Sequence, residues 1–482
     1  MSESLSSIPQ SLILTGPSEK TRLFFMLSWL HAIILERLRY LPVGWTKSYD
    51  FNDADYDMAL HLIDAWLVNV SNGKSSISPK QIPWTALKSL ISQNVYGGKI
   101  DVVGDQKTLD VLVDEIFTPA IFEREFVLVD GVESSNGLEP TVMCPDGIKL
   151  EQFSAWVNEL KDTLPPSWIG LPADSDILLK QFKSTTLLSK LRCMNERLSN
   201  VENSAKTGNP SNWSTTMREL IKKWLDSLPK NLPEFNAPDA TDPLMRFIGS
   251  ETETAAKLLA TIRSDLTSLD FILVGKDQHT NSTRLLTSLL RRGEVPKHWI
   301  SYTIPTLFTI NQFLDNLVER LKQVKELQES AMAGQLESLK VWIGGLFFPE
   351  AFLTAARQTA AKLIGASLEN LELAVMLDPT TDTAYTQGGM RIEMIGLKLE
   401  GAKWTDKKLD LVHKVVPDPL PPLILAWRQL NETKTAPSGS PKTIIHIPVY
   451  LNSDRKNILF YVNVLDPRVA LLTKRAIAVT AL

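Results

Sequence analysis

The sequence is poor in cysteine, with only Cys144 and Cys193 among its 482 residues. Two cysteines in so long a chain exclude a disulfide framework of the kind that stabilises small secreted domains. The sequence also begins without the charged, apolar and small-residue segments of a secretory signal peptide. Both absences predict a protein that works in a reducing compartment, and we expect it in the cytosol.

An excess of charge of one sign and long apolar runs are also missing. The sequence has 51 basic and 55 acidic residues, which leaves a net charge of −4 and no overall positive field that would favour nucleic acid. The most apolar window, Leu23 to Leu35, contains His31 and is bounded by Arg22 and Glu36. It is shorter than the roughly 20 residues that cross a bilayer. We therefore expect neither a nucleic-acid partner nor a membrane partner.

Metal ligands and nucleophiles do not form recognisable groups in the sequence. The six histidines are scattered, and no two have the i, i+4 spacing of a zinc-binding helix. Neither cysteine has a nearby histidine that would indicate a thiolate nucleophile, and a G-x-S-x-G elbow is missing. The acidic run from Asp53 to Asp57 has the first ligands of a calcium loop, but Met58 and Asp64 stand where that loop requires glycine and glutamate. The run is better explained as the start of a helix.

One segment has the outline of a phosphate-binding loop. An apolar stretch, residues 16–21 (GPSEKT) and an expected helix imitate the strand, loop and helix order of a P-loop, G-x-x-x-x-G-K-[ST]. Only three residues separate Gly16 from Lys20, however, and Glu19 would bring a carboxylate against the nucleotide. Ser18 as a helix N-cap, with Glu19 favoured by the helix dipole, explains the same residues. A nucleotide-binding enzyme that uses this segment is the weaker alternative.

Apolar residues recur every three or four positions through most of the sequence, which predicts helices. In the first part we expect four of them, from about Ser18 to Tyr40, Asn52 to Asn72, Pro83 to Gly97 and Leu109 to Phe117, packed as a small bundle that ends near Pro119. The middle is also predicted to be helical. Its clearest helices are a strongly amphipathic one over residues 310–327 and another from Pro349 to about Leu363.

After about Ser367 the apolar period changes from 3.6 to 2, which predicts strands. Five or six are expected, around residues 395–399, 409–411, 445–451, 458–464 and 476–482. The expected fold is mainly α with a C-terminal antiparallel β unit (α+β): a helical bundle, a helical middle and a small β-barrel or sandwich. Residues 200–212 are predicted to be an exposed loop, and residues 431–442 a mobile linker within the β unit.

The twelve tryptophans are more informative than any catalytic motif. Several, among them Trp45, Trp84 and Trp342, stand beside proline or glycine or near the expected ends of helices and strands. A large ring at such a place can anchor a turn against neighbouring helices. The pattern favours a structural role over stacking against a ligand.

Several unusual strings resemble the C-terminal region of dynein heavy chains and occur in that family's order. They include residues 36–45 (ERLRYLPVGW), 82–87 (IPWTAL), 96–101 (YGGKID), 342–352 (WIGGLFFPEAF), 396–402 (GLKLEGA) and 447–452 (IPVYLN). The resemblance extends from about residue 20 to the end, and residues 77–80 and 466–468 are closer to the cytoplasmic than to the axonemal members. Residues 102–109 depart from the family's pattern. Residues 122–290 match it poorly, so their role is left open.

This resemblance implies an organisation of the sequence. Residues 1–118 would be the helical lid of the sixth AAA module, residues 119–376 the helical part of the dynein C-terminal domain, and residues 377–482 its β-barrel part. In that family the domain lies across one face of the ATPase ring and influences coupling and force production. The candidate structural and interface residues are Trp45, Trp84, Gly97, Gly98, Trp342, Gly344, Gly345, Pro349, Glu350 and Arg357.

The resemblance also implies a function, that of a non-catalytic segment of an ATP-driven, minus-end-directed microtubule motor of the cytoplasm and cytoskeleton. Its partners would be the remaining AAA+ ring, the dynein complex subunits and, indirectly, microtubules. ATP and Mg would bind in the other ring modules, and this chain is expected to hold no catalytic residue, cofactor or metal. A separately encoded interaction module derived from a dynein ring is a second interpretation. Whether the 482 residues are a full gene product or a fragment is left open.

Overall fold

The structure is a computed structural model of the 482-residue chain. It describes residues 1–14, 16–131, 133–134, 137–138, 141–160, 165–177, 179–180, 183–184, 187–188, 191, 211–235, 241–300, 309–336, 338–377, 390–405, 408–412, 417–429 and 444–481. The predicted linker over residues 431–442 and most of the predicted loop over residues 200–212 lie outside these ranges. The last two residues of that loop belong to a helix.

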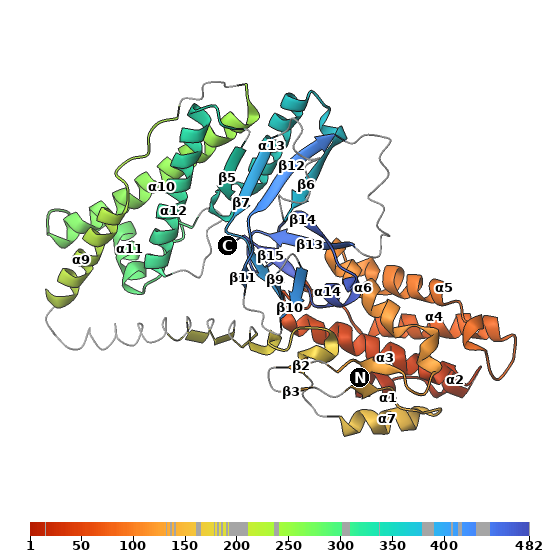
Figure 1. Cartoon of the computed structure of the whole chain (residues 1–482). Helices are drawn as coiled ribbons and strands as arrows, with labels where there is room; N and C mark the ends of the chain where they lie inside the picture. The colour runs from red at the N-terminus through yellow and green to blue at the C-terminus, as the bar shows by residue number, and fades with distance from the viewer. Residues whose placement is uncertain are drawn as a thin grey trace.

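The first part of the molecule is a helical bundle, as its apolar period predicts (Figure 1). Its α-helices are α1 (Ser2–Ser6), α2 (Gln10–Leu14), α3 (Lys20–Arg37), α4 (Asp53–Ser71), α5 (Trp84–Ser89), α6 (Val103–Ile116) and α7 (Leu150–Glu159). The π-helical turn η3 (Leu90–Val95) extends α5, and the 3₁₀ turns η5 (Pro119–Phe122) and η6 (Pro166–Ile169) follow later. Two short strand pairs, β1 (Val127–Val129) with β4 (Val142–Met143) and β2 (Glu133–Ser134) with β3 (Gly137–Leu138), precede α7. We call α1–α7 the N-terminal bundle.

The start of α4 confirms that the acidic run begins a helix. The Asn52 side chain accepts a hydrogen bond from the backbone N–H of Ala54 at 3.1 Å, and the Asp55 carboxylate accepts one from the backbone N–H of Asn52 at 3.0 Å. This reciprocal pair is a capping box, which satisfies donors that the first helical turn leaves free. The helix ends where Asn72 adopts a left-handed conformation, with φ at 47°.

The middle of the molecule forms a helical arm (Figure 1). Its helices are α9 (Ser211–Ser227), α10 (Pro243–Leu273), α11 (Asn281–Arg291) and α12 (Ile310–Met332). Asp242 caps α10, with Pro243 at the first helical position, where proline's missing N–H costs nothing. The amphipathic pattern over residues 310–327 is confirmed by α12, because its apolar face, including Phe313 and Leu317, is buried.

A four-stranded sheet follows the arm, in the order β5-β7-β12-β6. Its strands are β5 (Ser338–Trp342), β6 (Leu371–Met376), β7 (Arg391–Ile395) and β12 (Leu423–Gln429). The helix α13 (Pro349–Ile364) lies beside this sheet in Figure 1 and contacts α10 of the arm. The sheet is mixed, since β5 runs parallel to β7 and the other pairs are antiparallel.

A five-stranded sheet, in the order β11-β8-β15-β13-β14, completes the β unit. Its strands are β8 (Lys398–Glu400), β11 (Asp418–Pro419), β13 (Ile444–Tyr450), β14 (Ile458–Leu465) and β15 (Ala478–Thr480). A hairpin of β9 (Ala402–Thr405) and β10 (Lys408–Leu411) adjoins it, and the short helix α14 (Val469–Lys474) precedes β15.

The expectation of a mainly helical fold with a C-terminal β unit is confirmed, with two differences. The strands of the β unit begin at Ser338 rather than after Ser367, and the short pairs β1–β4 and β2–β3 lie in the middle, where only helices were expected; strands of two to five residues are too short to establish an apolar period. The pairing is mixed, since β15 runs parallel to β13 as β5 does to β7. The described strands form separate sheets and no closed barrel.

Three hydrophobic cores hold these parts together. The first lies within the N-terminal bundle and extends from Leu5 to Leu171. The second lies around both large sheets and α13, and the third lies inside the helical arm. No helix in the described ranges has the length and apolar character needed to cross a membrane.

Candidate functional site

A buried turn at the end of α3 brings Trp45 into the first core. The Trp45 side chain is fully buried, and its indole N–H donates to the backbone carbonyl of Ile34 at 3.0 Å. Its ring packs edge-on against Tyr49 with centroids 6.1 Å apart. Tyr49 in turn donates from its hydroxyl to Asp105 of α6 at 2.7 Å. The predicted tryptophan turn therefore ties α3 to α6.

Arg37, the last residue of α3, joins segments that are distant in sequence. Its guanidinium donates to the backbone carbonyls of Gly44 at 3.0 Å, Ile169 at 2.7 Å and Lys474 at 3.2 Å. The side chain is fully buried and lies over the Trp45 ring, 5.5 Å from its centroid. We call Arg37 and these three carbonyls the arginine joint. The joint connects the N-terminal bundle to α14, near the end of the β unit.

The electrostatics of the arginine joint are unusual. Burial lowers the pKa of Arg37 to about 10, and the nearby Asp105 carboxylate raises it in part. The guanidinium has exchanged water for neutral carbonyl dipoles, whose hydrogen bonds offset the cost of burying its charge. Lys474 adds an ion pair at the edge of the joint, with Nζ 2.6 Å from a carboxylate oxygen of Glu115 on α6.

A second joint lies at Trp342, the last residue of β5. Its indole N–H donates to the backbone carbonyl of Ala481 at 3.1 Å. Its backbone N–H and carbonyl both bond to the Gln323 side chain of α12, at 2.8 and 3.0 Å. Trp342 thus connects the arm, the four-stranded sheet and the residues that follow β15.

The two glycines after Trp342 are required by close packing. A side chain at Gly344 would overlap the carbonyl of Ala481, and one at Gly345 would overlap the Trp342 ring. Gly396 faces the same ring with φ at 76°, a left-handed conformation that glycine adopts without strain. The sequence string WIGG therefore folds the backbone tightly around its own tryptophan.

Two buried charges from the arm support this joint. Arg320 of α12 donates to the carbonyl of Leu346 at 3.1 Å and lies 5.6 Å from the centre of the Trp342 ring. Glu251 of α10 accepts hydrogen bonds from the backbone N–H groups of Phe347 at 3.1 Å and Phe348 at 2.7 Å. Burial lowers the pKa of Arg320 to about 10 and raises the pKa of Glu251.

The other candidates on α13 and its approach have simpler roles. Pro349 is buried at the first position of α13, and Glu350 is exposed in the first turn, where a carboxylate favours the helix dipole. Arg357 donates to the carbonyls of Leu368 at 2.6 Å and Leu371 at 3.3 Å. These contacts fix the backbone between α13 and β6.

The candidates in the N-terminal bundle also bind its turns. The Trp84 indole donates to the carbonyl of Pro79 at 2.8 Å, and its ring faces Phe122. Gly97 is buried where any side chain would overlap the carbonyl of Ser92, whereas Gly98 is exposed. All ten candidates thus have defined places, but they lie at several joints and do not converge on one catalytic centre. Their role in contacts with other modules stays a prediction.

The P-loop-like segment has different neighbours from a phosphate site. The stretch before it is the helix α2 rather than the strand that a P-loop requires. Lys20 is buried, forms an ion pair with Asp64 and lies 5.4 Å from the centre of the Phe24 ring. Glu19 is the N-cap of α3 without a side-chain cap bond, so the proposed Ser18 cap is wrong. The Glu19 carboxylate instead accepts from the Ile77 backbone N–H at 3.2 Å.

The possible metal ligands of this chain include its histidines and its two cysteines, Cys144 and Cys193. In the ranges that the structure describes, His, Cys, Asp and Glu side chains form no group that could hold a metal ion. Cys144 is buried, and burial raises the pKa of its thiol, which disfavours the reactive thiolate. Cys193 lies outside the described residues.

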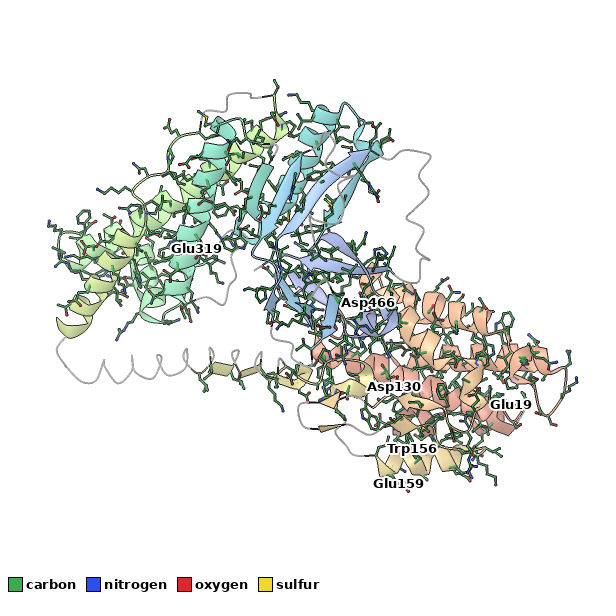
Figure 2. The ribbon with its side chains drawn as sticks, viewed as in Figure 1. Glu19, Asp130, Trp156, Glu159, Glu319 and Asp466 are labelled. Carbon is green, nitrogen blue, oxygen red and sulfur yellow. The ribbon has the colours of Figure 1, made fainter. Side chains whose placement is uncertain are left out.

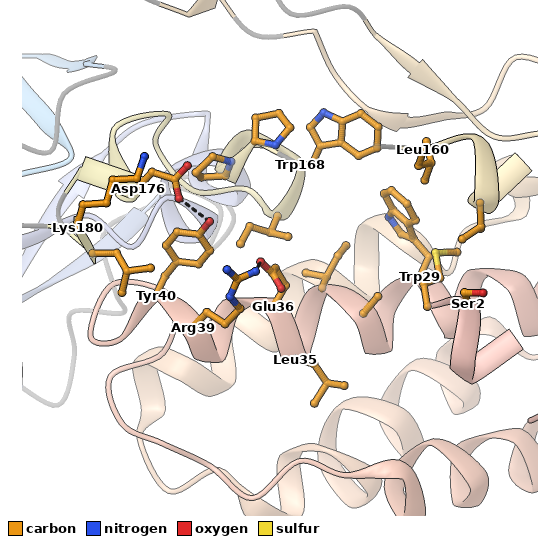
Figure 3. A pocket seen from close by; sticks show the side chains of 18 of the residues that line it. Ser2, Trp29, Leu35, Glu36, Arg39, Tyr40, Leu160, Trp168, Asp176 and Lys180 are labelled. Atoms are coloured by element: carbon orange, nitrogen blue, oxygen red, sulfur yellow. Dashed lines mark hydrogen bonds and ion pairs between the residues drawn. The ribbon is translucent and has the colours of Figure 1, made fainter. Parts of the chain in front are cut away.

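A cavity of about 890 Å³ opens between α3, α7 and η6 (Figure 3). Trp29 and Trp168 line it, and Trp29 also packs against Trp156 of α7, with ring centroids 6.2 Å apart. At one end the Tyr40 hydroxyl donates to Asp176 at 2.8 Å, and burial together with this carboxylate raises the pKa of Tyr40. Nearby, Glu36 and Arg39 form an ion pair with each other.

Sequence reasoning missed the side chains that do most of the joining. Arg37 and Arg320 donate to backbone carbonyls of residues far away in sequence, and such acceptors leave no pattern in it. The only sequence signal was their position, since each stands on a helix whose other buried residues are mostly apolar.

Comparison with protein families identifies both parts of the molecule. Residues 20–175 match the family described as "Dynein heavy chain AAA lid domain", and residues 181–480 match the family of the C-terminal domain of dynein heavy chains. Together the two matches span nearly all of the sequence.

Similarity along nearly all of this chain to individual proteins points to the same family. The sequence is 36% identical over 484 residues to "Dynein heavy chain, cytoplasmic" of Drosophila melanogaster, and 33% identical over 468 residues to the Dictyostelium discoideum protein of that name. It is 24% identical over 464 residues to human "Cytoplasmic dynein 2 heavy chain 1". Each comparison covers 95% of this chain and 10% of the relative, so the chain spans about a tenth of these relatives' length. The chain belongs to the dynein heavy chain family, of which it holds an AAA lid domain and the C-terminal domain.

Proposed function

We propose that this chain is a non-catalytic part of an ATP-driven, minus-end-directed microtubule motor, in which it couples an AAA lid to the C-terminal domain. The support comes from the names of these relatives, which are dynein heavy chains, and from the joints described above. ATP and Mg would bind in other ring modules. The partners would be the remaining AAA+ ring, dynein complex subunits and, indirectly, microtubules, in the cytoplasm and on the cytoskeleton.

The observation that carries this proposal is the arginine joint. A single buried guanidinium binds carbonyls at the lid turn, at η6 and at the end of α14. Breaking any one of these bonds leaves a buried polar group unsatisfied, which costs about 1–3 kcal/mol. A lid that moves with the nucleotide state of the ring would therefore carry α14 and the attached sheet with it.

The absence of catalysis in this chain is part of the proposal. Lys20 already neutralises Asp64 inside the bundle, so nucleotide binding at residues 16–21 would require a buried ion pair to break. We expect labelled ATP at about 1 mM to show no saturable binding to the 482-residue protein. This result would mean that the free energy of ATP binding is weaker than about −4 kcal/mol. Saturable binding that is lost in Lys20→Ala would favour the alternative, a nucleotide-binding enzyme.

The coupling role can be tested in a dynein motor that contains this lid and C-terminal domain. We expect Arg37→Gln to leave basal ATP hydrolysis nearly unchanged and to reduce its stimulation by microtubules about two- to thirtyfold, as expected for loss of about 0.5–2 kcal/mol of coupling. Arg39→Gln is the matched control, because Arg39 is exposed and pairs only with Glu36 in the described contacts. A motor with Arg37→Gln that matches the control in both rates would contradict the proposal.

A further inference from the structure

A second cavity lies beside the arginine joint, between the N-terminal bundle and α14. Its volume is about 300 Å³, at the lower end of the range for ligand pockets, about 300–1,000 Å³. Residues of α3, α6, β1, η6 and α14 line it, so its wall is built from both ends of the sequence. Most of its lining side chains are apolar, among them Trp29, Ile116, Trp168 and Leu471, and the charged ones are Glu115, Asp130, Lys474 and Arg475.

Arg475, the C-cap residue of α14, lines this cavity and forms no ion pair with any residue that the structure describes. The residue is 6% exposed, and none of the described residues accepts a hydrogen bond from its Nη1 atom. Other buried arginines of the fold have acceptors: Arg37 has three carbonyls, and Arg455 has the Glu400 carboxylate at 2.8 Å. A buried charged donor without a partner is costly, so an oxygen ligand at this place would be favourable.

The charges around Arg475 define what would bind. Lys474 is paired with Glu115 at 2.6 Å, and Asp130 (Figure 2) is exposed at the cavity wall. These two carboxylates disfavour a dianion such as phosphate, while the guanidinium favours a single negative charge. Burial lowers the pKa of Arg475.

The apolar wall defines the rest of the ligand. The rings of Trp29 and Trp168 have centroids 6.0 Å apart and are inclined by 44°, so they form one aromatic side of the cavity. Leucine, isoleucine and valine side chains provide further apolar lining. We propose that this cavity binds a carboxylate carried on an apolar group, with the carboxylate at Arg475 and the apolar part against Trp29 and Trp168.

The carboxylate could belong to a free small acid or to the end of a peptide, because both present the same chemistry. The test uses the 482-residue protein and phenylacetate, with phenylacetamide as the neutral analogue of equal shape, in isothermal titration calorimetry. We expect the acid to bind at least about tenfold more tightly than the amide, because only the acid forms a hydrogen bond between two charged groups at the buried guanidinium. This comparison requires no substitution, so it holds whether or not a variant folds.

Substitutions then test whether the guanidinium of Arg475 binds the carboxylate. We expect Arg475→Gln to weaken phenylacetate binding at least about tenfold and to remove the difference between acid and amide. Arg39→Gln, at the neighbouring larger cavity, should bind both compounds as the original protein does. Equal affinity for acid and amide, no heat of binding for the acid up to about 10 mM, or an unaltered Arg475→Gln variant would each overturn the proposal.

A last experiment distinguishes a free small acid from the C-terminus of a peptide. Short peptides that end in leucine with a free carboxylate are compared with phenylacetate and with their amidated forms. Tighter binding of the free peptide than of phenylacetate, lost on amidation, would assign the cavity to the C-terminus of a partner protein. Tighter binding of phenylacetate would assign it to small apolar acids.

Discussion

Buried arginines do much of the joining in this molecule. Arg37, Arg320 and Arg455 lie at different places in the fold, and each donates to at least one backbone carbonyl. The planar guanidinium presents five donors in a rigid fork, so a single arginine can satisfy carbonyls from several segments at once. Lysine has the charge without the fork. At this scale the fold depends on geometry that composition does not reveal.

We expect Arg37→Gln to lower the free energy of unfolding by about 3–4 kcal/mol, because buried carbonyls lose their donors. Arg37→Lys should recover only part of this loss, since it restores the charge without the fork. Urea unfolding followed by circular dichroism measures both. Arg39→Gln, close by in sequence and exposed, should change stability by less than about 0.5 kcal/mol. A loss of under about 1 kcal/mol for Arg37→Gln would show that water replaces the guanidinium.

His31 gives the first core a dependence on pH. Burial lowers its pKa below 6.5, although Asp53 raises it in part, and its Nδ1 lies 3.0 Å from the Tyr96 hydroxyl. The unfolded protein therefore binds a proton that the folded protein does not, and stability falls as pH drops below 6.5 until the lowered pKa is passed.

Urea unfolding at a series of pH values tests the effect of His31. The slope should reach at most about 1.4 kcal/mol per pH unit, and His31→Gln should remove it. His61→Gln, on the exposed face of α4, is the control and should keep the slope of the original protein. A slope that persists in His31→Gln would place the responsible group elsewhere.

Long elements were predictable from sequence, and short ones were not. The helices α3, α4, α12 and α13 follow from apolar periodicity and from caps such as Asn52 and Pro349. The strand β5 and the helix α14 are too short to establish a period, and their conformation depends on the partners that they contact. The start of the β unit was accordingly placed too late.

The division of the sequence at residue 118 stays a prediction. The first hydrophobic core continues past that point to Leu171, and the match to the AAA lid family runs to residue 175. Residues of α7 and η6 cover the same faces of α3 that the earlier helices leave open, as the packing of Phe25 on Phe153 at 4.5 Å illustrates. Sequence periodicity finds helices, but it does not say which core they join.

Two glycine substitutions should have opposite effects. At Gly344 a methyl group would overlap the Ala481 carbonyl, so Gly344→Ala should destabilise the protein by about 2–4 kcal/mol. At Gly104, inside α6, a methyl group would meet no atom within 4 Å, and Gly104→Ala should stabilise it by about 0.5–1 kcal/mol. Thermal unfolding compares the two. Equal effects would mean that the turn at Gly344 relaxes easily.

For the whole molecule, the arginine joint predicts that α14 opens together with the N-terminal bundle. Hydrogen exchange should therefore protect the amides of α14 about as well as those of α6, which it contacts. In Arg37→Gln, exchange in α14 should rise by roughly a hundredfold while the amides of α12 stay unchanged. Fast exchange of α14 in the original protein would show that the joint forms only part of the time.

The place of β15 has a consequence for how the protein is made. This strand lies between β8 and β13, yet its residues leave the ribosome after those of both neighbours. At about 5–20 residues per second, β8 waits for roughly 4–16 s with an unpaired edge that other nascent chains can join. Premature stop codons before Ala478 would leave both edges open permanently. We expect such products to aggregate or to be degraded in cells, because an unpaired strand edge can pair with other chains.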